Sequence, residues 1–188
     1  KLLIMKEFIY PEMMVHVPLC TVKEPKNVLI VSDNAAALEA EVARHDAIAS
    51  KTVSASNLLE SLRNEADASA DVVLIDTLTD DAAVMAHINR VLSEEGLVVL
   101  KHPSLDDETA NKNLMQIMGN YFKIIMPYNV GNGETLLLAS KAYHPTADII
   151  LHRADMLDGQ QYYNCDIHPA AFATPNYIRK AYLGIIRN

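Results

Sequence analysis

The sequence predicts an α/β fold, in which helices cover both faces of a mostly parallel sheet with one antiparallel edge. Short apolar runs recur along the 188 residues, stretches with helical spacing separate them, and a turn rich in glycine and asparagine precedes the last run. Continuous apolar runs are typical of strands buried on both faces, and their alternation with helices is typical of parallel sheets. The length fits one domain.

Five segments are predicted to form strands. Four of them contain four successive apolar residues, which indicates burial on both faces, and residues 124–126 add a fifth. The loop at residues 127–133 contains two glycines and two asparagines, so it is predicted to return the chain as a hairpin and to create the antiparallel edge. The four apolar runs are residues 28–31, 72–75, 97–100 and 136–139.

Four stretches are predicted to form helices. Apolar residues recur with helical spacing in residues 81–93, and Gly96 is predicted to end that helix before the next strand. In residues 106–121, Asp107 and Glu108 lie in the first turn, where negative side chains interact favourably with the helix dipole. The other two stretches are residues 35–44 and 57–64.

The composition excludes several classes of protein. Hydrophobic residues make up 50% and charged residues 21%, as in a soluble globular chain. Lys+Arg 16 against Asp+Glu 24 gives a net charge of -8, which argues against a nucleic-acid surface because phosphate binding needs clustered basic residues. No apolar run approaches the ~20 residues of a membrane span. Cys20 and Cys165 lie far apart and lack metal-ligand spacing, which favours a reducing cytoplasm and no metal site.

The carboxyl ends of the strands are the expected place for a ligand in this fold class. Asp76 directly follows the run 72–75, before any helix position that it would cap, so we expect it to have a catalytic or binding role. Asp33 and Asn34 follow the first apolar run, and Asp80 lies in the same segment as Asp76. For these three residues and for Asp81, helix capping is the competing interpretation.

Two long motifs resemble sequences of the spermidine synthase family of aminopropyltransferases. Residues 7–13, Glu-Phe-Ile-Tyr-Pro-Glu-Met, match the pattern EFxYxEM that precedes the first core strand in that family. Residues 162–175 resemble its C-terminal pattern YYNxxxHxAAFxxP. The resemblance implies a Rossmann-like core of the S-adenosylmethionine-methyltransferase type in residues 27–188. Residues 1–26 are then the remnant of a missing N-terminal β domain together with a linker helix.

The reaction of that family moves an aminopropyl group from decarboxylated S-adenosylmethionine to putrescine, giving spermidine and methylthioadenosine, with no metal and no resident cofactor. An alkylammonium has a pKa near 10.4, so its deprotonation at pH 7 costs about 4.6 kcal/mol and calls for a carboxylate. The resemblance assigns this role to Asp76. It places Tyr10 in the amine pocket, although Pro11 replaces the amide or histidine that normally follows. It also carries over Asp80 and Tyr128 as substrate contacts.

The side of the site expected to bind the nucleoside departs from the family pattern. The glycine-rich loop GGGDGG corresponds to residues 32–37, which contain no glycine. Asp33 and Asn34 are therefore the expected contacts to the donor substrate. The turn that contacts adenine corresponds to residues 54–56, which lack its acidic residue.

The interval between His45 and Asp76 is short. It holds about 30 residues, whereas a second strand, a second helix and a third strand are expected to need some 50. We therefore expect a segment to be missing or mobile near the Ile48–Ala49 junction, and the acidic residue that binds the ribose to belong to it.

Three functions remain open from the sequence. The retained Asp76 and Tyr10 favour an aminopropyltransferase, which the resemblance implies to be a homodimer or homotetramer. The changes at Pro11, Ala35 and Ala55 favour a non-catalytic relative that acts as a binding or scaffold protein. A methyltransferase of the same fold ranks last, because it still needs a glycine in its first loop. The tyrosines and the histidine of the C-terminal motif are expected to be packing residues.

Overall fold

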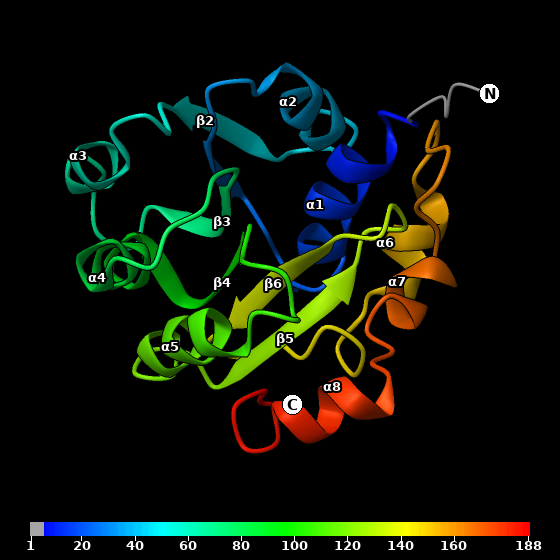
Figure 1. Cartoon of the computed structure of the whole chain (residues 1–188). Coiled ribbons are helices and arrows are strands. Elements are labelled where there is room, and N and C mark those ends of the chain that lie inside the picture. The colour runs from blue at the N-terminus through cyan, green and yellow to red at the C-terminus, as the bar shows by residue number, and fades with distance from the viewer. Residues whose placement is uncertain (1–5) are drawn as a thin grey trace.

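Six strands form one sheet at the centre of the protein (Figure 1), and they are β1 (Asn27–Val31), β2 (Ala49–Val53), β3 (Ala70–Ile75), β4 (Leu92–Leu100), β5 (Ile124–Asn129) and β6 (Thr135–Ser140). The computed structural model describes residues 6–188, and the strand order is β2-β1-β3-β4-β6-β5. Neighbouring strands from β2 to β4 pair in parallel, whereas β6 runs antiparallel to both β4 and β5. The predicted α/β fold with an antiparallel edge is confirmed.

Helices cover both faces of the sheet. Alternate residues of a strand point to opposite faces, so Val28 and Ile30 of β1 belong to one core and Leu29 and Val31 to the other. The first core lies under α1 (Ile9–Leu19), α2 (Ala36–Val42), α6 (Leu151–Met156) and α7 (Ile167–Ala170). The second lies under α3 (Leu58–Arg63), α4 (Ala82–Val91), α5 (Glu108–Met118) and α8 (Asn176–Ala181).

Of the polar residues that follow β1 and β3, only some cap a helix in the structure. The Asp81 carboxylate caps α4 by accepting a hydrogen bond of 2.7 Å from the backbone N–H of Ala83. In α2, the capping position belongs to Ala35. The capping interpretation of Asp33 and Asn34 is therefore wrong.

The prediction that Gly96 ends a helix is also wrong. α4 ends at Val91, and β4 begins at once because Leu92 has extended backbone, with φ -72° and ψ 139°. Gly96 lies inside β4, where a Cβ atom would come within 3.1 Å of the Asp71 carbonyl oxygen. The glycine therefore permits close contact between β4 and β3.

The interval between His45 and Asp76 contains β2, α3 and β3, so the expectation that it is too short for them is wrong. These elements have only five or six residues each. Tight turns join them, and Ala47 and Ala68 adopt left-handed backbone there, with φ 60° and 51°. The chain runs directly from Ile48 into β2, whose side chains are mostly exposed at the sheet edge. Short elements at an exposed edge therefore fill the interval.

The segment before β1 is part of the same folded unit. Met13, Met14 and Val17 of α1 are fully buried in the first core. Residues 1–5, which belong to the predicted N-terminal remnant, lie outside the described residues. Within residues 6–188, no helix combines the length and the apolar character that crossing a bilayer requires.

Candidate active site

Asp76 stands at the carboxyl end of β3. Its backbone N–H donates to the Val31 carbonyl oxygen at 2.9 Å, next to the paired part of β1 and β3. Asp76 Oδ1 accepts a hydrogen bond of 2.6 Å from the Tyr10 hydroxyl, and Oδ2 accepts one of 2.7 Å from Ser32 Oγ. Three segments, α1, the end of β1 and the end of β3, therefore meet at one carboxylate.

Tyr10 reaches Asp76 from the first turn of α1. Burial raises the pKa of the Tyr10 hydroxyl far above its usual range, and the hydrogen bond to Asp76 raises it further. The hydroxyl therefore keeps its proton near neutral pH and donates it to the carboxylate in the hydrogen bond.

Lys101 also belongs to the site, and the sequence analysis missed it. It follows β4 as Asp76 follows β3, and the register pairs Leu100 with Ile75, so both side chains leave the sheet at the same edge. Lys101 Nζ lies 3.3 Å from Asp76 Oδ1 and 5.3 Å from the centre of the Tyr10 ring. Its position directly after an apolar run is the sequence signal that could have identified it.

A cleft of about 940 Å³ opens beside these residues. Tyr10, Asp76, Lys101 and the predicted donor contact Asn34 all line it. With Asp76, three more acidic side chains give the lining four carboxylates against one lysine, a balance that suits a cationic ligand. The three are Glu7, Asp106 and Glu134.

His102 forms the cleft wall next to Lys101, and both of its ring nitrogens have partners. Its Nδ1 lies 2.7 Å from Asn111 Oδ1, and its Nε2 lies 2.8 Å from Thr135 Oγ1. The amide nitrogen of Asn111 lies within 3.1 Å of three carbonyl oxygens and donates its two hydrogens to them, so its oxygen accepts from His102 Nδ1–H. Burial lowers the pKa of His102. The ring is therefore neutral, and Nε2 accepts the Thr135 hydroxyl proton.

Asp33, the other predicted donor contact, does not line the cleft. Its carboxylate accepts hydrogen bonds from Ser56 Oγ at 2.5 Å, Ser54 Oγ at 2.8 Å and the Ala55 N–H at 3.0 Å. These contacts, Ser56 first, lower the pKa of Asp33. In this structure Asp33 joins the loop after β1 to the loop after β2, which are the two segments where the family glycines and acid are replaced.

Two predicted substrate contacts lie away from the cleft. Asp80 is exposed and precedes the helix cap Asp81. Tyr128 is buried in β5, where its hydroxyl donates to the Met13 carbonyl oxygen at 3.0 Å and its ring lies 5.1 Å from that of Phe172. Asp80 is surrounded by solvent and Tyr128 packs beneath α1, so neither lines the cleft in this structure, and their role as substrate contacts stays a prediction.

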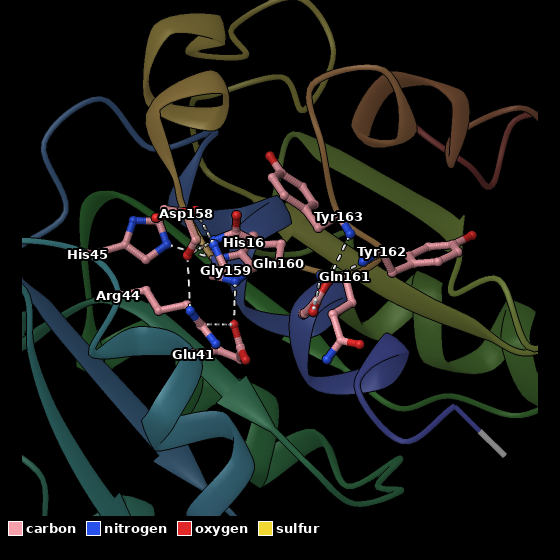
Figure 2. Close-up of polar contacts among 11 residues, drawn as sticks. His16, Glu41, Arg44, His45, Asp158, Gly159, Gln160, Gln161, Tyr162 and Tyr163 are labelled. Atoms are coloured by element: carbon pink, nitrogen blue, oxygen red, sulfur yellow. Dashed lines mark hydrogen bonds and ion pairs between the residues drawn. The ribbon is translucent and has the colours of Figure 1, made fainter. Parts of the chain in front are cut away.

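A buried carboxylate joins the two family-like motifs. Glu12 of α1 accepts hydrogen bonds of 2.8 Å from the backbone N–H groups of Gln161, Tyr162 and Tyr163, the segment drawn beside α1 in Figure 2. Only 1% of Glu12 is exposed. The second motif thus holds the helix that carries Tyr10, a role that no local sequence signal indicates.

His168 of the C-terminal motif packs as expected and does not face the cleft. It is fully buried, and its Nε2 lies 2.8 Å from the Pro145 carbonyl oxygen. A carbonyl only accepts, so Nε2 carries the proton, and Nδ1 accepts a hydrogen bond of 2.7 Å from the Tyr163 hydroxyl. Burial lowers the pKa of His168 to about 4.

A polar network also fixes α1 against α2 (Figure 2). His16 is fully buried, with Nε2 2.7 Å from Glu41 Oε2 and Nδ1 2.9 Å from His45 Nε2. Arg44 Nε lies 2.9 Å from the same Glu41 oxygen. Burial opposes ionisation of Glu41, but His16 and Arg44 outweigh it and lower the Glu41 pKa. This network stabilises the position of α1.

Comparisons with known proteins agree with the motifs. Residues 7–78 match the family described as the spermine/spermidine synthase domain. The chain is 26% identical over 215 residues to a polyamine aminopropyltransferase of Helicobacter pylori (strain HPAG1), an alignment that covers 99% of this chain and 82% of the relative. It is 34% identical over 99 residues to the polyamine aminopropyltransferase of Helicobacter acinonychis (strain Sheeba), covering 50% of this chain and only 37% of that relative.

The fold is that of solved spermidine synthases. The spermidine synthase from Thermotoga maritima superposes with a TM-score of 0.82 and 23% identity, over 96% of this chain and 76% of that chain. A spermidine synthase in complex with the transition state analogue AdoDATO superposes with a TM-score of 0.83 and 22% identity, over the same shares of the two chains. At these identities, the superpositions establish the shared architecture of the core.

Proposed function

This chain belongs to the spermine/spermidine synthase family, and we propose that it transfers an aminopropyl group from decarboxylated S-adenosylmethionine to putrescine, giving spermidine and methylthioadenosine. The observation that carries the proposal is the Asp76 carboxylate, which lies at the cleft and accepts hydrogen bonds from Tyr10 and Ser32. A carboxylate held in this way is suited to accept a proton from an ammonium group.

In the proposed reaction, Asp76 takes a proton from the acceptor ammonium and frees the nitrogen lone pair. The nitrogen attacks the methylene carbon bound to the donor sulfonium. A carbon–nitrogen bond forms as the carbon–sulfur bond breaks, and its electrons leave with methylthioadenosine. The hydrogen bonds from Tyr10 and Ser32 fix the orientation of the carboxylate, and fixed orientation lowers the entropic cost of the transition state.

The remote ammonium of putrescine fits the acidic lining of the cleft. Glu7, Asp106 and Glu134 line it together with Asp76, so the cleft offers further carboxylates to the second charge of a dication. A charge of this sign also steers cations towards the cleft before contact.

The test is release of methylthioadenosine from decarboxylated S-adenosylmethionine and putrescine, measured for the wild type and for Asp76→Asn. We expect turnover to fall about 10²- to 10⁴-fold in the variant, the range for loss of a general base. Asp46→Asn is the control, because Asp46 is exposed and lines a different pocket. Equal turnover in wild type and Asp76→Asn would remove Asp76 from this role.

The arrangement of Asp33 favours one alternative, a non-catalytic relative that binds amines. The Asp33 carboxylate is occupied by the loop 54–56, and Ala35 replaces the aspartate of the family's glycine-rich loop. Calorimetry separates the two functions: an enzyme binds both substrates, whereas the alternative gives heat with putrescine and none with decarboxylated S-adenosylmethionine.

The same proposal includes a cytoplasmic location and a homodimer or homotetramer. The free cysteines Cys20 and Cys165 support a reducing compartment, and the family resemblance supports the assembly. Light scattering of the purified protein tests the assembly, and a molar mass equal to that of one chain contradicts it.

A further inference from the structure

Lys101 lies where the attacking amine of an acceptor has to lie. We propose that the Lys101 side chain is a tethered competitor of the acceptor ammonium at Asp76, and that it determines which amines the cleft binds. This inference rests on the proposed function, because it concerns the acceptor half of the same site.

The first argument is position. Lys101 Nζ is 3.3 Å from Asp76 Oδ1, and an acceptor ammonium that gives its proton to Asp76 directly has to come within hydrogen-bonding distance of the same carboxylate. The same nitrogen lies 5.3 Å from the centre of the Tyr10 ring, within the range of a cation–π interaction. Tyr10, Asp76 and Lys101 all line the cleft, so the ammonium lies beside the carboxylate that faces it.

The second argument is chemical identity. A lysine side chain consists of four methylene groups that end in an ammonium, which is putrescine without its second ammonium. Contacts that recognise one therefore recognise the other. The Asp76 carboxylate accepts hydrogen bonds from the hydroxyls of Tyr10 and Ser32 and forms an ion pair with the Lys101 ammonium, so it already holds one cation of this kind.

The third argument is charge. Two ammonium groups on one carboxylate repel each other, so an arriving acceptor displaces Lys101 from Asp76. The Lys101 side chain is 43% exposed, which leaves it room to turn towards solvent. An ion pair exposed to this degree contributes little, and its loss changes an equilibrium by up to about fivefold.

Amine selectivity follows from this competition. A diamine gains contacts with the remote carboxylates Glu7, Asp106 or Glu134 that Lys101 does not make, and these offset the displacement. A monoamine of the same length, butylamine, gains none of them. Lys101 therefore weakens the binding of every amine. A monoamine has no further contact to offset this loss, whereas a cation with a second charge does.

The experiment is calorimetric titration with putrescine and with butylamine, without the donor, on wild type and Lys101→Met. Methionine keeps most of the side-chain length and removes the ammonium. We expect Lys101→Met to bind both amines more tightly, each by up to about fivefold, because both are released from the same competing ion pair. In turnover, KM for putrescine falls by the same factor while kcat changes less.

Lys112→Met is the matched control. Lys112 also lies over a tyrosine ring, 5.9 Å from the centre of Tyr182, and pairs with Glu108 at 3.0 Å, but it does not line the cleft. Its removal leaves amine affinity unchanged. Lys101→Gln is a second variant that keeps a neutral polar group if the methionine variant fails to fold, as judged by circular dichroism.

Equal or weaker amine binding by a folded Lys101 variant overturns the inference, as does the absence of any amine binding in both proteins. The proposed function fails separately. If the wild type releases no methylthioadenosine while Lys101→Met binds putrescine more tightly, the transfer reaction is refuted and the competition stands. If the wild type turns over and the variant shows no gain in affinity, the competition is refuted and the reaction stands.

Discussion

The Tyr10 hydroxyl lies 2.6 Å from Oδ1 of Asp76, although 66 residues separate them in sequence. Replacing Tyr10 by phenylalanine removes this hydrogen bond between α1 and the predicted catalytic carboxylate by deleting a single oxygen atom. It makes the contribution of α1 to the site measurable.

We expect Tyr10→Phe to lower kcat/KM for putrescine about tenfold, the scale of one lost hydrogen bond to a charged group. The ring remains beside Lys101, so packing is preserved. Tyr143→Phe is the matched control, because its hydroxyl donates to Glu95 at 2.6 Å outside the cleft. Equal kinetics for wild type and Tyr10→Phe would show that the hydrogen bond does not orient Asp76.

We expect Glu12→Gln to reduce the free energy of unfolding by about 3 kcal/mol, measured by urea denaturation. An amide has one acceptor oxygen, so its NH₂ group faces backbone donors in the segment 161–163 and leaves them unpaired. Glu60→Gln provides the comparison, since Glu60 is exposed and its ion pair with Arg63 is long, at 3.8 Å. A similar small effect for both variants contradicts the structural role of Glu12.

We expect stability to fall as pH drops below neutrality, partly because of His168. Its pKa is about 4 in the folded protein and near 6.5 in the unfolded chain. Above pH 6.5 neither state binds the proton and His168 contributes no pH dependence. Between about 6.5 and 4 only the unfolded state binds it, so stability is lost across this window, in total about 3 kcal/mol.

The measurement is urea denaturation at several pH values for wild type and His168→Gln. A glutamine amide can still donate to the Pro145 carbonyl oxygen, which preserves one of the two hydrogen bonds. The variant loses less stability than the wild type between pH 7 and 4. Burial also lowers the pKa values of His45 and His102, so a residual loss of the same sign remains. Parallel curves for the two proteins refute the assignment to His168.

We expect Gly131→Ala to lower the melting temperature more than Gly133→Ala does. Both glycines have left-handed backbone, with φ 76° and 89°, so alanine costs about 1 kcal/mol at either position. At Gly131 a Cβ would also collide with the Tyr162 side chain, whereas at Gly133 no atom lies within 4 Å. The difference in melting temperature between the two variants therefore measures the contact of Gly131 in the hairpin with Tyr162 of the C-terminal motif. Equal melting temperatures would exclude that contact.

The inner strands were predictable because they are buried on both faces. Residues 28–31 and 72–75 lie within β1 and β3, where continuous apolar sequence has one explanation. β2 escaped prediction because its sequence, Ala-Ser-Lys-Thr-Val, faces solvent at the sheet edge and carries no apolar signal. Gly96 was misassigned because a glycine after a helix and a glycine needed for strand packing look alike in sequence.

The site was partly predictable for a similar reason. Asp76 and Lys101 follow apolar runs, so their place at the sheet edge depends on local sequence alone. The contacts of Glu12 and Asp33 depend on segments that approach only after folding. For Tyr128, position in a hairpin did not reveal which face of β5 its ring occupies, and in the structure that face is the one beneath α1.

The attachment of α1 to residues 161–163 has a consequence for biosynthesis. Ribosomes release the amino end first, so α1 emerges long before the backbone donors that Glu12 requires. Until residue 163 has been made, the nascent polypeptide lacks the full set of backbone N–H groups that pair with this carboxylate in the folded protein. The candidate site is therefore assembled late in translation, and a shortened transcript that ends before this point encodes a protein whose α1 lacks this attachment.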